Sequence, residues 1–208
     1  MEFKPASYGK CPLPDKGKLL DRLKPGVLNR VAIRRHAIVT TALSFGIAGE
    51  LEKRGFKLNG KMLETAHIAR ALSLRLRKVT GFEREKAILA AGELMKRQGH
   101  PELAEMVSKY YSLHEPGIIR KLKLEDVPFL MAGYMTREVE TGAGKTHRIM
   151  HPERAFEILC EQQPERREFL EKEYENVKIL TKWLEKNGVN LKVIARKINF
   201  ELTRGDYG

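Results

Sequence analysis

Cysteine is scarce in this 208-residue sequence, which contains only Cys11 and Cys160. The two lie far apart and form no Cys/His cluster, which excludes a disulfide scaffold and a thiolate zinc site and suits a reducing cytosol. Long apolar runs are also missing, because the longest uncharged stretch, Ala37 to Gly49, is too short to span a membrane. The N-terminal residues contain no apolar segment of the secretory type, so we expect a soluble, cytoplasmic protein with no membrane partner.

Acidic residues are outnumbered in the chain. Lys and Arg total 39 against 27 Asp and Glu, which gives a formal net charge of +12 at pH 7. The excess is concentrated between Lys24 and Lys78, where twelve Lys or Arg face three acids for a net charge of +9. Such a segment is either a solvated helical face or a surface that binds anionic partners. The small number of neutralising acids favours the second interpretation.

Proline is absent between Pro25 and Pro101, and apolar residues recur there at helical spacing. This pattern predicts an all-α fold, a helical bundle formed by a single core. We expect helices at residues 18–24, 27–54, 60–78, 82–98, 101–113, 124–138, 152–162, 165–187 and 191–199. Asn59 fits an N-cap. Helix stops are expected at three glycines, Gly55, Gly81 and Gly99.

Two segments are expected outside the helices. Residues 1–14, rich in Gly, Pro and Lys, should lie along the surface, and Glu140 to Met150 should form an exposed loop. The GAGK run in that loop lacks the spacing of a phosphate-binding loop, because Val139 stands where the first glycine belongs. We therefore divide the chain into a surface segment (1–14), a helical domain (15–187) and a C-terminal helix and tail (188–208).

A resemblance to a known family begins at Arg34. The stretch RRHAIVTTALSFGIAGELEKRGFKLNGKMLETAHIARAL is similar to the opening of an HD-domain metal-dependent phosphohydrolase. Arg35 and His36 match the family's first histidine, Leu58 and Asn59 match its turn, and Leu63 to Ala66 match the approach to the His-Asp dyad, all without a gap. The similarity continues through AILAAGELMKRQGHPELAEMVSKY and LEDVPFLMAGYMTRE and covers about residues 18 to 187. It implies an HD-like helical bundle with a pocket at His36.

The metal ligands of that family are not retained. The positions that align with them hold Arg70, Ala71, Ala87, Ala132 (followed by Gly133), and Lys109 with Tyr110. A hard divalent metal needs several carboxylate or imidazole ligands, and His36 alone cannot supply them. Arg70 instead offers a permanent charge and a five-donor fork that suits phosphate. The resemblance therefore implies the family's fold and pocket, while the residues argue against a metal, a cofactor or the family's hydrolysis.

These residues favour a catalytically inactive HD-like domain that binds a phosphate-bearing ligand, either a nucleotide or a nucleic-acid backbone. The candidate anion-binding residues are Arg34, Arg35, His36, Arg70, Arg75, Arg77, Lys78 and Lys109. Two alternatives stay open: an active phosphohydrolase with a rearranged site, and a pseudoenzyme that holds an acidic protein surface or a second copy of itself. The same residues also have structural interpretations. His36 could be a hydrogen-bonded core histidine, and Arg70 could extend from a buried helix to solvent.

Overall fold

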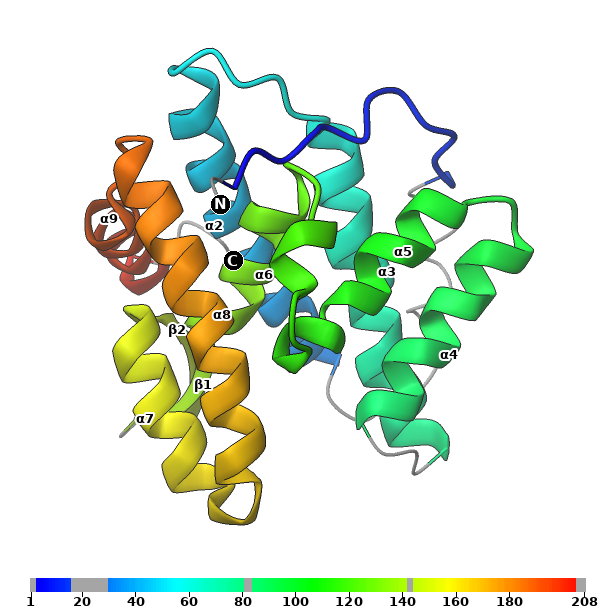
Figure 1. The fold of residues 1–208 in the computed structure, drawn as a ribbon. Coiled ribbons are helices and arrows are strands. Elements are labelled where there is room, and N and C mark those ends of the chain that lie inside the picture. The colour runs from blue at the N-terminus through cyan, green and yellow to red at the C-terminus, as the bar shows by residue number, and fades with distance from the viewer. Residues whose placement is uncertain (1–2, 16–29, 81–83, 142–143, 205–208) are drawn as a thin grey trace.

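The computed structural model describes residues 3–15, 30–80, 84–141 and 144–204, and these ranges are mostly helical (Figure 1). They contain eight α-helices, three short 3₁₀ helices and one two-stranded sheet. The α-helices are α2 (Arg30–Glu52), α3 (Gly60–Thr80), α4 (Arg84–Arg97), α5 (Pro101–Lys109), α6 (Asp126–Met135), α7 (Pro152–Gln162), α8 (Arg167–Lys186) and α9 (Leu191–Thr203). The 3₁₀ helices are η1 (Ser112–His114), η2 (Ile118–Lys121) and η3 (Pro164–Arg166). The all-α prediction is confirmed.

Local signals set several helix ends where the sequence predicts them. The Asn59 side chain accepts a hydrogen bond from the Met62 amide at 3.1 Å and caps α3. Gly55 and Gly99 adopt φ values of +89° and +85°, the left-handed conformation that glycine tolerates best at a helix stop. The expected helix 18–24, the start of helix 27–54 and the stop at Gly81 lie outside the described residues.

The segment after α6 differs from the prediction. The expected helix 124–138 ends at Met135, and strands β1 (Thr136–Thr141) and β2 (Gly144–Ile149) form an antiparallel hairpin. The expected loop from Glu140 to Met150 was therefore wrong. Each strand holds one apolar residue among polar and charged ones, Val139 in β1 and Ile149 in β2, so the sequence shows no polar–apolar alternation that would predict the hairpin.

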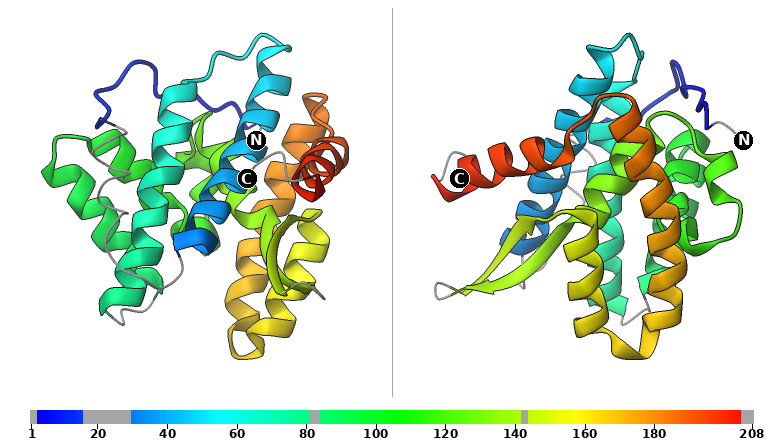
Figure 2. Two further views of the ribbon diagram at one scale, coloured as in Figure 1. Left: turned by 180° about the vertical axis from the view of Figure 1, so that it is seen from behind. Right: turned by 60° about the vertical axis from the view of Figure 1, so that its left-hand side comes forward.

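Helix α6 is the centre of the bundle. All ten of its residues are buried, and it contacts α2, α3, α5, α7 and α8. Its sequence DVPFLMAGYM carries apolar residues on every side, the composition of a helix that is covered all round. The views in Figure 2 show α2 and α3 on one side of α6 and α7 and α8 on another. Residues of α6 therefore face several helices at once.

Helix α8 docks through an apolar stripe. Leu170, Val177, Leu180 and Leu184 are buried, and Phe169 is half-buried. Trp183 packs edge-on against Phe3 and Phe56, with ring centroids 5.3 and 5.6 Å away.

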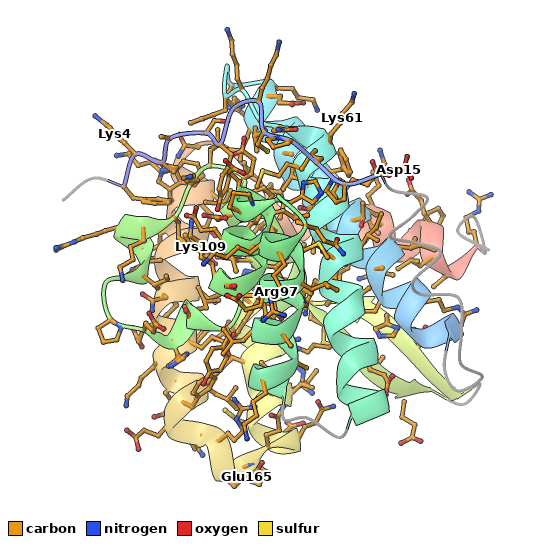
Figure 3. All side chains as sticks on the ribbon, turned by 90° about the vertical axis from the view of Figure 1, so that its right-hand side faces the viewer. Lys4, Asp15, Lys61, Arg97, Lys109 and Glu165 are labelled. Carbon is orange, nitrogen blue, oxygen red and sulfur yellow. The ribbon has the colours of Figure 1, made fainter. Side chains whose placement is uncertain are left out.

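Residues 3–15 form no helix or strand and cross the molecule from Lys4 to Asp15 (Figure 3). The buried carboxylate of Glu125 holds this segment by accepting bonds from the Ser7 hydroxyl and the Tyr8 amide. Glu125 also accepts a bond from the Asn59 amide at 3.0 Å. One buried acid thus links the N-terminal segment, the start of α3 and the start of α6.

Candidate anion-binding site

Helices α2 and α3 pack together and bring His36 near Arg70. The Arg70 guanidinium carbon lies 3.7 Å from the centroid of the Tyr110 ring, a cation–π contact, and the side chain is only 5% exposed. Arg70 therefore does not extend to solvent, which contradicts the structural interpretation considered for it. The Tyr110 hydroxyl donates a 3.0 Å hydrogen bond to the Gly133 carbonyl and fixes the ring against α6.

Gly133 makes room for this arrangement. A Cβ built on Gly133 would lie 2.7 Å from Nη1 of Arg70 and would also collide with the Tyr110 ring. The resemblance aligns the family's last acid with about Ala132, and in the structure the neighbouring Gly133 faces Arg70. The missing side chain leaves the space that the guanidinium and the phenol ring fill.

The hairpin contributes two further basic side chains. The His147 ring of β2 lies 5.1 Å from the His36 ring, measured between centroids. Arg137 of β1 is 9% exposed, and its guanidinium lies 5.2 Å from the Tyr134 ring centroid. Neither was a candidate from the sequence, because Arg137 was expected in the helix 124–138 and His147 in the loop from Glu140 to Met150.

A third histidine, His67, lies one turn before Arg70 on α3 and is fully enclosed. Its ring contacts Phe129 with centroids 4.9 Å apart, and neither ring nitrogen has a hydrogen-bond partner among the described residues. Within the same described part of the chain, Nε2 of His36 and the hydroxyls of Tyr134 and Thr136 also lack a partner. We call His36, His67, Arg70, Arg137 and His147 the Arg70 cluster.

Electrostatics keeps the histidines of the cluster neutral. The pKa of His36 lies well below its ordinary value. The largest cause is burial, followed by electrostatic interactions with Arg70, His147, Arg137 and His67. Burial and then Arg70 do the same to the pKa of His67. Burial lowers the pKa of His147, Glu138 opposes this, and Arg35 adds to it. The fixed positive charge of the cluster therefore comes from its two guanidinium groups.

Two carboxylates lie close to this region, Glu138 opposite His147 and Glu173 near Tyr134. Burial, and then Glu173, raise the pKa of Tyr134 above its ordinary value, while Arg137 lowers it. The Tyr134 hydroxyl therefore keeps its proton and can act as a hydrogen-bond donor. Neutral histidines, a phenol and two guanidiniums together offer donors to an anion and a charge to hold it.

The remaining predicted anion-binding residues fall into three groups. Arg35 is exposed, and it lies near enough to His147 to lower the pKa of that ring. Lys109 is buried elsewhere, and its ammonium pairs with Asp126 at 2.7 Å and Glu105 at 2.6 Å. The positive charge of Lys109 is therefore paired with two carboxylates. The side chains of Arg34, Arg75, Arg77 and Lys78 lie outside the described part of the structure.

Three of the positions that the resemblance aligns with metal ligands are apolar. Ala71, Ala87 and Ala132 are buried in the core. Among the side chains described, no three His, Cys, Asp or Glu converge in the manner of a metal site. The Arg70 cluster is rich in hydrogen-bond donors, and Glu138 and Glu173 lie beside it.

Comparisons with known proteins give no family for this chain. No protein-family model, no curated protein and no solved structure matches it. In the ranges that the structure describes, none of the helices combines the length and the apolar character needed to cross a membrane.

Proposed function

We propose that this chain is a non-catalytic, HD-like helical domain that binds a phosphate-bearing small molecule, such as a nucleotide, at the Arg70 cluster. One observation carries the proposal. Two guanidinium groups and three neutral histidines gather between α2, α3, α6 and the hairpin, and Nε2 of His36 is buried there without a hydrogen-bond partner among the described residues.

Buried polar groups are costly unless they are hydrogen-bonded. The charges that act on His36 come from Arg70 and Arg137. A phosphate group supplies several acceptor oxygens and a negative charge, and guanidinium forks match its geometry. A bound phosphate would therefore accept a hydrogen bond from Nε2 of His36, and the two guanidinium groups would attract it.

The cluster reaches the surface on one side. His36 and His147 are partly exposed, Arg35 is exposed nearby, and Arg70 is buried. In the proposed complex the phosphate lies at His36 and His147, with Arg70 behind it. The remainder of the ligand extends toward Arg35 and solvent.

The HD-like part of the proposal rests on the order of the helices and on the spacing from His36 to Arg70. In the resemblance, Arg70 stands where the first residue of the metal-binding dyad would stand. A guanidinium can hold an anion, but it cannot lower the pKa of a bound water as a metal does. The proposal is therefore binding without hydrolysis.

Calorimetric titration with inorganic phosphate, pyrophosphate and ATP tests this function. Arg70→Gln should weaken binding of the tightest of these ligands by at least about tenfold, the effect expected for a charged hydrogen bond. Arg120→Gln is the matched control, because Arg120 is exposed on η2 and its loss changes the net charge equally. Equal affinities in the two variants, or no binding by the wild-type protein, would refute the proposal.

A turnover assay separates binding from catalysis. Phosphate release from the same ligands should stay at the background rate with added Mn²⁺, Mg²⁺ or Ni²⁺. Release that disappears in His36→Ala would instead identify an active phosphohydrolase. A folded Arg137→Gln variant, checked by circular dichroism, provides a second measurement should Arg70→Gln fail to fold.

A further inference from the structure

Helix α9 is fixed to the protein along one face. Leu191, Ala195 and Ile198 are buried on that face. A Cβ built on Gly46 of α2 would come within 2.7 Å of the Ile194 side chain, which shows how closely the two helices approach. The Asn199 side chain clamps β2 by donating to the Ile149 carbonyl at 2.7 Å and accepting from its amide at 2.9 Å. The orientation of the helix about its own axis is therefore set.

The opposite face of α9 combines apolar and cationic side chains. Val193 is 61% exposed and Phe200 is 59% exposed. Four exposed basic residues surround them: Lys192, Arg196, Lys197 and Arg204. We call these six residues the α9 face. Figure 2 shows α9, the red helix, extending away from the bundle, and the side chains of the α9 face are exposed among the described residues.

The charges of the α9 face differ from those of the neighbouring helix. On α8, exposed cations are neutralised by acids one turn away, in the pairs Arg167–Glu171, Lys172–Glu168 and Lys178–Glu175. On α9, none of the four basic residues forms an ion pair with another described residue. Surface cations that no acid neutralises attract an extended anion.

We infer that the α9 face binds single-stranded nucleic acid. A polyanion complements the four cations, and the exposed Phe200 ring offers a surface on which an unpaired base can stack. Bases in a duplex are already stacked on each other, so Phe200 favours a single strand over a double strand. Val193 and Phe200 are two helical turns apart and separated by charges, which is too little apolar area for stable insertion into a lipid surface.

The inference is independent of the proposed function. The Arg70 cluster draws its side chains from α2, α3 and the hairpin, and none of the residues of the α9 face belongs to it. Arg70→Gln should consequently leave the affinity for single strands unchanged within twofold.

Fluorescence anisotropy with a labelled oligothymidine of about 20 nucleotides tests the inference, at about 50 and 200 mM salt. The triple variant Arg196→Gln, Lys197→Gln, Arg204→Gln should bind on the order of a hundredfold more weakly at the lower salt concentration. The slope of log affinity against log salt should become shallower by about 2, because each lost phosphate contact contributes roughly 0.7 on a single strand.

The matched control is the triple variant Arg167→Gln, Lys172→Gln, Lys178→Gln on α8, which removes the same charge from a neighbouring helix. It should retain the wild-type affinity within about threefold. All six substituted side chains belong to exposed or only partly buried surface positions, so circular dichroism should show unchanged helix content in both triple variants.

Phe200→Ala separates stacking from charge. It should lower the affinity for the single strand about tenfold and leave the affinity for a duplex of equal length unchanged. Equal binding by the two triple variants would overturn the inference, as would an equal effect of Phe200→Ala on single strands and duplexes. Loss of binding to anionic phospholipid vesicles by the α9 variant, with strand binding intact, would overturn it in favour of a membrane surface.

Discussion

Gly133→Ala introduces one methyl group at the contact between α6 and Arg70. The new Cβ would lie 2.7 Å from Nη1 of Arg70 and 3.1 Å from Cζ of Tyr110, both well inside van der Waals contact. Tyr110 cannot withdraw freely, because its hydroxyl bonds to the Gly133 carbonyl and its ring packs against Phe129 with centroids 6.2 Å apart. The strain must therefore displace the guanidinium, the ring or the helix.

Two opposing effects decide the size of the change. Alanine in the interior of a helix is favoured over glycine by about 0.5–1 kcal/mol. Overpacking a well-packed core costs about 1–3 kcal/mol. We expect Gly133→Ala to lower the free energy of unfolding by about 1–2 kcal/mol, measured by urea denaturation. The same variant should weaken phosphate binding, since Arg70 is displaced.

Gly92→Ala is the matched control on α4. Its Cβ would approach the Ser108 hydroxyl at 2.6 Å, but a hydroxyl can rotate away. This variant should be neutral or more stable by up to about 1 kcal/mol. If Gly133→Ala is as stable as Gly92→Ala and binds phosphate normally, the contact between Gly133, Tyr110 and Arg70 does not exist as described.

Three further predictions concern stability. Asp126→Asn removes the buried carboxylate that pairs with Lys109 at 2.7 Å, and should lower the free energy of unfolding by about 3 kcal/mol in urea. Asn199→Ala should speed hydrogen exchange at the Ile149 amide, its partner at 2.9 Å, and a rate equal to the wild-type rate would contradict the clamp. Burial, and then the Arg70 guanidinium, lower the pKa of His67 in the folded protein. As the pH falls below about 6.5, the His67 ring is therefore protonated in the unfolded chain before it is protonated in the folded protein. Stability should decline from that pH downward, by at most about 1.4 kcal/mol per pH unit for this residue, and His67→Leu should remove that part of the pH dependence.

Helical periodicity predicted most of the fold, because an amphipathic stripe fixes a helix whatever its partners are. The stripe of α8 and the cap at Asn59 are examples. The hairpin was missed because the apolar run of α6 leads straight into β1, and only pairing with β2 stops the helix at Met135. Pairing between strands is a tertiary contact that the periodicity of one segment does not report.

The candidate site was only partly predictable for the same reason. Spacing along the chain related His36 to Arg70, and His67 is three residues before Arg70, which places it on the same face of α3. Gly133 could have been noticed as the one residue without a side chain in an otherwise apolar central helix. The positions of Arg137 and His147 depend on how the hairpin folds over α2, which local sequence does not reveal.

Nuclear magnetic resonance of the histidine rings tests most directly whether an anion binds at the Arg70 cluster. Titration with pyrophosphate should shift the ring signals of His36 and His147 saturably, and the shifts should vanish in Arg70→Gln but persist in Arg120→Gln. A bound anion favours the protonated imidazole, so the pKa of His36 should rise toward its ordinary value as the ligand saturates. If the His36 and His147 signals stay in place while only exposed lysine and arginine signals move, the claim is wrong.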